Sequence, residues 1–228
     1  MRRFIRTLFI GCLAIVVIAA GLGLYGYRSL NQVPAFYAEA LAKPAQEPAK
    51  AAYKFEQEVL ELQNDVRREG DWQATFSAEE INGWLANDLP VKFPRALPQH
   101  VSDPRVAISP QMIQVACKYA DPSFSSVISL GAEQKMTTEP NVIAIRIKQV
   151  RAGALPVPLA NFLEEISTHS AQAGVPLRWG EEEGDPVAYI TLPMNQPEFE
   201  GKMLRVESVE LKDGALMVAG KTEKEKDS

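Results

Sequence analysis

The middle of the chain alternates between apolar and polar side chains, and this period of two limits the fold more than any other feature. Every second position is apolar across 113–119 and again across 143–147. Such alternation is typical of half-buried strands. A further strand is expected over 128–136, with turn signals at 121–122 and 139–141. Three strands joined by short turns predict an antiparallel meander with one solvent-exposed face.

Helical patterns lie on both sides of this meander in the sequence. Residues 49–68 combine strong helix formers with apolar side chains at near-helical spacing. Ser77 and Glu80 match a capping box, so a second helix starts there and must end before Pro90. A third amphipathic helix is expected after Pro158. The predicted fold class is therefore α+β, with a curved antiparallel β-sheet packed against two or three amphipathic helices.

The remaining segments are expected to be extended or to turn. The proline-rich span 90–104 predicts an extended crossover between elements. Three further strands are predicted at 187–192, 204–211 and 215–219, and residues 212–214 have the composition of a hairpin turn between the last two.

The N-terminus has the pattern of a transmembrane helix. Residues 7–27 carry no charge, and at about 1.5 Å per residue they are long enough to span a hydrocarbon layer of roughly 30 Å. Arg2, Arg3 and Arg6 precede this run, which by the positive-inside rule predicts a cytoplasmic N-terminus and an extracytoplasmic C-terminal part. A cleavable signal peptide is the alternative, because it has the same basic start and small residues at 19–21.

These patterns divide the chain into five parts. They are a cytoplasmic basic stub at 1–6, a transmembrane anchor at 7–27, a connector at 28–48, an extracytoplasmic domain at 49–220 and a charged tail at 221–228. The predicted location is the inner (cytoplasmic) membrane, with a single pass and the membrane as a partner through the N-terminal helix.

The charge balance argues against nucleic acid as a partner. The formal net charge is −5, and all of the charge in 1–28 is basic, so the rest of the chain is more acidic than the total indicates. An acidic domain repels phosphate backbones. The two cysteines, Cys12 and Cys117, are too few for a disulfide framework, and Cys117 is expected on the apolar side of its strand.

The sequence holds no recognised catalytic motif, including phosphate-binding glycine loops, HExxH, CxxC and GxSxG. His100 and His169 have no evident partner and are interpreted as surface residues. The acidic run Glu181, Glu182, Glu183 and Asp185 could hold calcium in principle, but a solvated turn is favoured. We therefore assign no catalytic residue, cofactor or metal. An envelope hydrolase that uses an unrecognised acid pair or His100 is the least favoured hypothesis.

Two functional hypotheses remain open beside an ordinary packed core. In the first, the curved sheet leaves an elongated apolar groove for a lipid or another apolar ligand. The candidate lining residues are Trp84, Val115, Ile143, Ile145, Phe162 and Leu163. In the second, the chain is a scaffold or accessory subunit whose helix 49–68 or open sheet edge binds another envelope protein.

Three segments carry a resemblance to a known family. Residues 76–85, 153–158 and 204–214 resemble YpmS-type and LmeA-type bacterial envelope proteins, which are single-pass or exported. The soluble part of those proteins is similar to tubular lipid-binding half-barrels. The resemblance implies a non-enzymatic envelope role, in which the domain holds or presents a lipid or supports an assembly of membrane proteins. The spans 90–104 and 180–186 depart from that pattern.

Overall fold

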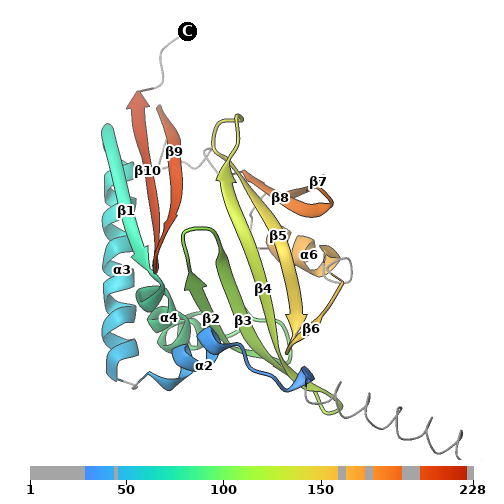
Figure 1. Cartoon of the computed structure of the whole chain (residues 1–228). Coiled ribbons are helices and arrows are strands. Elements are labelled where there is room, and N and C mark those ends of the chain that lie inside the picture. Colours follow the sequence, from blue (N-terminus) through green and yellow to red (C-terminus); the bar gives the residue numbers. More distant parts are fainter. Residues whose placement is uncertain (1–28, 44–45, 159–162, 173–176, 192–200, 225–228) are drawn as a thin grey trace, which may run out of the picture.

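The computed structural model describes residues 29–43, 46–158, 163–172, 177–191 and 201–224. Strands hold 48% of the described residues and helices hold 29%. Two antiparallel sheets dominate Figure 1: a small sheet with the long helix α3 beside it, and a large curved sheet with α2 at its lower end.

The small sheet contains three strands in the order β1-β10-β9. Its strands are β1 (Gly70–Ser77), β10 (Ala215–Lys224) and β9 (Lys202–Lys212). Burial alternates along β1, where Trp72, Ala74 and Phe76 face inward. Helix α3 (Gln46–Val66) packs beside this sheet, with the ring centroids of Phe55 and Phe76 5.5 Å apart.

The large sheet has the order β2-β3-β4-β5-β8-β7, and the short strand β6 pairs with β5. Its strands are β2 (Val101–Ile108), β3 (Ile113–Ala120), β4 (Ser125–Met136), β5 (Val142–Ala152), β6 (Leu155–Pro156), β7 (Leu177–Glu182) and β8 (Asp185–Thr191). The predicted meander is confirmed, because β3, β4 and β5 are consecutive antiparallel neighbours. The two C-terminal strands and their turn are also confirmed, with Gly214 at a positive φ of 76°.

The predicted capping box is confirmed at the start of α4 (Ala78–Asn87). The Ser77 hydroxyl accepts a hydrogen bond from the Glu80 amide at 3.1 Å, and the Ser77 amide donates to Glu80 Oε2 at 2.9 Å. Glu80 is buried and also accepts a hydrogen bond from the Lys54 ammonium of α3. Burial alone raises the pKa of Glu80, but the hydrogen bonds from Lys54 and Ser77 outweigh it and lower the pKa. The cap therefore also ties α4 to α3.

Helices α3 and α4 touch at a glycine. A Cβ on Gly83 would lie 2.5 Å from the Pro48 carbonyl oxygen and 2.7 Å from both Ala51 Cβ and the Ala52 amide nitrogen. Only a residue without a side chain allows this approach of α4 to the backbone of α3. Gly83 thereby fixes one wall of the cavity described below.

Amide side chains join the elements at the sheet edges. Asn82 of α4 donates to the Val106 carbonyl at 2.8 Å and accepts from the Val106 amide at 2.7 Å, so α4 lies along the free edge of β2. Asn141 does the same for β9, with bonds to Leu204 O at 3.1 Å and from Val206 N at 2.7 Å. These contacts satisfy edge groups that would otherwise lack partners.

The segment that follows residue 28 packs onto the large sheet. Ser29 O accepts a hydrogen bond from the Ala154 amide at 2.7 Å, and Leu30 O accepts one from the Ser126 hydroxyl at 2.7 Å. Helix α2 (Ala35–Ala42) follows, and its Tyr37 is 2% exposed. Tyr37 forms a core cluster with Ala116 and Val127 of the sheet. Part of the segment predicted as a connector is therefore built into the fold.

The predicted α+β class is wrong, because the chain is mostly β and forms two sheets. The missing strand content lies in two stretches that were interpreted as crossover and turn. Strand β2 begins within the proline-rich span, and β7 ends within the acidic run. Both are edge strands of the large sheet. Edge strands tolerate proline and charged side chains, so they show no clear alternation.

The prediction of a transmembrane, single-pass chain is also contradicted. Within the described part of the chain, no helix combines the length and the apolar character needed to cross a membrane. The segment 7–27, on which the prediction depended, lies outside the described residues, as does the basic stub 1–6.

Candidate functional site

A hollow with a mostly apolar lining lies under the proline-rich crossover, between α4 and the start of β2. It has a volume of about 500 Å³, and we call it the crossover groove. Its lining is Leu85, Ala86, Leu89, Pro90, Phe93, Pro94, Leu97, Pro98, Gln99, Val101, Ser102, Asp103 and Pro104. Most of these side chains are apolar, so the groove matches the chemistry of an apolar ligand better than that of a sugar or a nucleotide.

Contacts to α3 and α4 hold the crossover in place. The short helix α5 (Leu89–Lys92) carries Lys92, whose ammonium lies 2.9 Å from the Asp88 carboxylate and also contacts Glu56 of α3. Trp84 Nε1 donates to the same Glu56 at 3.3 Å. The Trp84 ring lies 5.9 Å from Phe93, a lining residue of the groove. One outer wall of the groove is therefore supported by an aromatic contact and by ion pairs.

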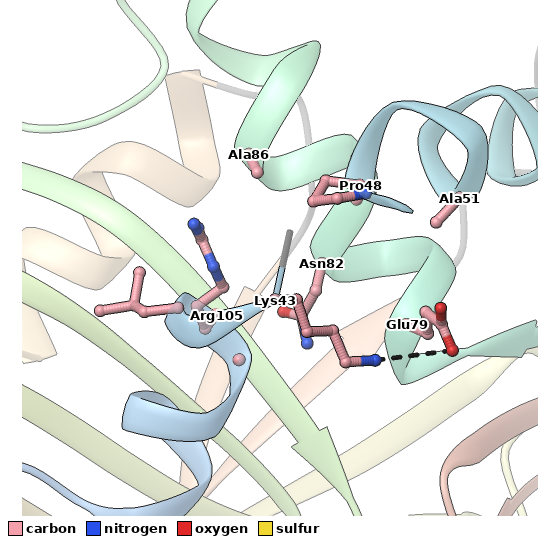
Figure 2. A pocket seen from close by; sticks show the side chains of 10 residues that line it. Lys43, Pro48, Ala51, Glu79, Asn82, Ala86 and Arg105 are labelled. Carbon is pink, nitrogen blue, oxygen red and sulfur yellow. Dashed lines mark ion pairs between the residues drawn. The ribbon is translucent and has the colours of Figure 1, made fainter. Parts of the chain in front are cut away.

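A second, smaller cavity lies beside the crossover groove, and we call it the Arg105 pocket (Figure 2). Its volume is about 50 Å³, room for only a few water-sized atoms. It is lined by Ala40, Leu41, Lys43, Pro48, Ala51, Glu79, Asn82, Gly83, Ala86 and Arg105. Ala86 also lines the crossover groove, so this residue of α4 forms a wall that the two hollows share.

Arg105 is the buried charged group of this pocket, with 8% of its surface exposed. The register of β2 against β3 shifts between Ser102 and Arg105, which is the signature of a bulge that redirects side chains. Figure 2 shows the Arg105 side chain extending between α2 and α4 toward Ala86. Its Nη1 donates a hydrogen bond to the neighbouring Pro104 carbonyl at 2.7 Å. Among the described residues no carboxylate lies within ion-pair distance of Arg105.

The other polar groups around the pocket are already bonded. The Lys43 ammonium lies 3.5 Å from Glu79, and both side chains are well exposed. Both ends of the Asn82 amide are occupied by Val106. The Tyr37 hydroxyl of α2 donates to the Asp103 carbonyl of β2 at 3.0 Å. Burial, and next the Asp103 charge, raise the pKa of Tyr37 to about 12, so this phenol stays neutral.

The predicted lining residues fall into separate places. Val115 on β3 and Ile143 and Ile145 on β5 share one face of the large sheet, where Val115 is 37% exposed. Trp84 lies on α4 beside the crossover, and Leu163 begins α6 (Leu163–Gln172). Phe162 lies outside the described residues. The structure brings together three of the six, and their role in binding stays a prediction.

The other sequence candidates have ordinary surroundings. His100 is exposed, has a positive φ of 68° and meets the Tyr119 ring edge-on. His169 lies in α6, and its side chain is outside the described part. In the acidic run, Glu183 and Asp185 both form ion pairs with Arg146. Their carboxylates therefore fasten the β7–β8 turn to strand β5 through Arg146.

Sequence reasoning missed Arg105 and most of the groove. The signal for the groove was present as prolines interspersed with apolar residues in 89–98, but that span was interpreted as an extended crossover. The burial of Arg105 has no local signal, because it depends on α2, which lies far earlier in the chain.

Comparison with known proteins adds no assignment to this geometry. No family model matches the chain, and no curated protein matches its sequence. The predicted resemblance to envelope lipid-binding proteins is untested by these comparisons. The crossover groove and the Arg105 pocket are therefore the features from which we infer a function.

Proposed function

We propose that this protein is a non-enzymatic binding module that holds an apolar chain, such as the acyl chain of a lipid, in the crossover groove. The observation that carries the proposal is the groove itself. Its volume of about 500 Å³ lies inside the range of roughly 300–1,000 Å³ that is usual for small-molecule sites. Leu85, Leu89 and Leu97 supply apolar walls, and prolines supply a rigid rim.

The exposure of the crossover supports the same occupant. Phe93, one of the lining residues, is 53% exposed. Large apolar side chains at the mouth of an apolar groove provide a surface that an acyl chain can cover. The energetic gain comes from the removal of this apolar area from water, at about 25 cal/mol per Å².

The test uses N-phenyl-1-naphthylamine, an uncharged apolar dye, with dodecanol as competitor. We expect the wild-type chain to bind the dye and dodecanol to displace it. Leu97→Asp places a carboxylate in the groove and should weaken binding by about tenfold or more, because a buried unpaired charge is strongly unfavourable. Val91→Asp is the matched control, since it adds the same charge to the same segment outside the lining, and it should leave the affinity within about twofold.

Two results would overturn this proposal. One is a wild-type chain that does not bind the dye at all. The other is an equal loss of affinity in both aspartate variants, which would trace binding to general apolar surface and not to the groove.

A second function, the docking of a partner helix, is favoured by the outer face of α3. Tyr53 is 64% exposed and Leu60 is 58% exposed, and the two lie seven residues apart on one side of the helix. A photo-crosslinking amino acid at position 53 or 60 should give one adduct of a single mass in cells. The same reagent at Asp65, which is also exposed but lies on another side of the helix, is the control. Equal adducts at position 65 would count against a specific docking face.

The location outside the cytoplasm also stays a proposal. Fractionation of cells that express a tagged full-length chain tests it. Recovery of the chain in the cytosolic fraction without detergent would contradict it.

A further inference from the structure

The Arg105 pocket contains a cation that has no carboxylate within ion-pair distance among the described residues. A guanidinium carries five N–H donors, and one of them is used on the Pro104 carbonyl. The residue is more than nine-tenths buried, and no described carboxylate pairs with it. The cost of burying a charge is normally offset by a partner of opposite sign. Glu79 also lines the pocket, but its carboxylate lies 3.5 Å from the Lys43 ammonium and is not paired with the guanidinium (Figure 2).

We propose that Arg105 binds an anionic group, a carboxylate or a phosphate, in the pocket between α2 and α4. The pocket is of the right size for such a group, since about 50 Å³ holds a few heavy atoms and no more. The planar guanidinium matches both carboxylate and phosphate with two parallel hydrogen bonds. Lys43 lies on the pocket wall and adds a second positive charge, which it shares with Glu79.

The position of the pocket indicates where the anion comes from. Ala86 lines both hollows, and the groove residues Asp103 and Pro104 directly precede Arg105 on β2. A ligand whose chain lies in the crossover groove would therefore place its polar end next to the guanidinium. This part of the inference depends on the proposed function and names the ligand class as an anionic amphiphile. A free phosphate is the other source of the same chemistry.

Titration with three ligands separates the two sources. Dodecyl phosphate carries both parts, dodecanol carries the chain alone, and inorganic phosphate carries the anion alone. For the wild-type chain we expect dodecyl phosphate to bind about tenfold or more tightly than dodecanol. Arg105→Gln should remove that advantage and leave dodecanol binding within about twofold. Arg95→Gln is the matched control, because Arg95 is exposed on the same crossover and does not line either hollow.

A second pair of variants keeps the test valid if Arg105→Gln does not fold. Ala86→Glu places a carboxylate at the wall that the Arg105 side chain approaches, and Ala86→Gln has nearly the same shape without the charge. We expect Ala86→Glu to have a higher Tm than Ala86→Gln, because it supplies an internal partner. We also expect it to lose about tenfold or more of the affinity for both phosphate ligands.

Each outcome has a distinct meaning. Phosphate binding that depends on Arg105 while dodecanol does not bind supports the anion site and rejects the proposed function. Inorganic phosphate that binds as tightly as dodecyl phosphate supports the anion site with a free anion as its source. In the last outcome, dodecanol binds, and neither Arg105→Gln nor Ala86→Glu changes the affinity for either phosphate ligand. That result overturns the anion site and leaves the proposed function of the groove standing.

Discussion

Two arginines of the large sheet illustrate opposite ways of placing a positive charge. Arg146 on β5 meets the tip of the β7–β8 hairpin, where its guanidinium lies 2.7 Å from Asp185 and 2.9 Å from Glu183. Lys148 reaches the same Asp185 at 2.7 Å. Arg105 on β2 is the more buried of the two, with 8% of the residue exposed, and it has no such partner among the described residues.

The difference shows which charges the fold completes by itself. The Arg146 cluster is closed, because two carboxylates of one hairpin compensate two cations of the neighbouring strand. The Arg105 pocket is open, although its greater burial makes compensation more important. In a fold optimised only for stability, the more buried arginine would have the carboxylate partners and the more exposed arginine would lack them. We therefore interpret the hairpin cluster as structural and the Arg105 pocket as a binding site.

The largest expected effect is at the glycine that closes the Arg105 pocket. Gly83→Ala places a Cβ against backbone atoms of α3, which cannot move away alone, and should lower the free energy of unfolding by about 3 kcal/mol. Gly184→Ala in the hairpin beside Arg146 meets no atom within 4 Å but has a positive φ of 84°. That variant should cost only about 1 kcal/mol. Urea unfolding measures both, and an equal cost would contradict the tight contact between α3 and α4.

The next largest effect is a change in the free energy of unfolding that has opposite signs at the two arginines. Arg105→Met removes an uncompensated buried charge and should raise the free energy of unfolding by about 1–2 kcal/mol in phosphate-free buffer. Arg146→Met removes a paired cation near the surface and should lower it slightly. Urea unfolding of both variants in a buffer without oxyanions is the measurement. A clear loss of stability in Arg105→Met would mean that the charge is compensated inside the fold.

The smallest effect is a difference in how stability depends on pH at Arg146 and at Arg105. Hydrogen bonds from Lys148, and next from Arg146, lower the pKa of Asp185 below its ordinary value of 3.8. A lowered pKa in the folded state means that the contribution of Asp185 is fully present above pH 3.8 and is lost as the pH falls through the folded pKa. The difference between wild type and Arg146→Met should therefore shrink below about pH 3.8, while the difference for Arg105→Met should not change. Parallel shrinkage of both differences would place an acid beside Arg105.

The elements that local sequence determines were predicted correctly. The capping box depends on Ser77 and Glu80 alone, and both of its hydrogen bonds form. The alternation in 113–119 and 143–147 depends on one buried face, and both segments are strands of the meander. In these cases, residues close in sequence carry all of the information.

The missed features depend on residues that are distant in sequence. Strand β2 contains Pro104 and a bulge, and it pairs only because Asn82 and β3 satisfy its two edges. The Arg105 pocket needs α2, α4 and β2 together, so neither its burial nor its lack of a carboxylate can be recognised from neighbouring residues. The sheet face with Val115 and Ile145 was predicted, but the groove formed away from those residues, under the crossover.

A crystal structure of the full-length chain with dodecyl phosphate tests the central claim most directly. We expect the phosphate within hydrogen-bond distance of the Arg105 guanidinium and the alkyl chain beneath Phe93 and Leu97. Density for the chain over Val115 and Ile145, with no phosphate at Arg105, would contradict the account.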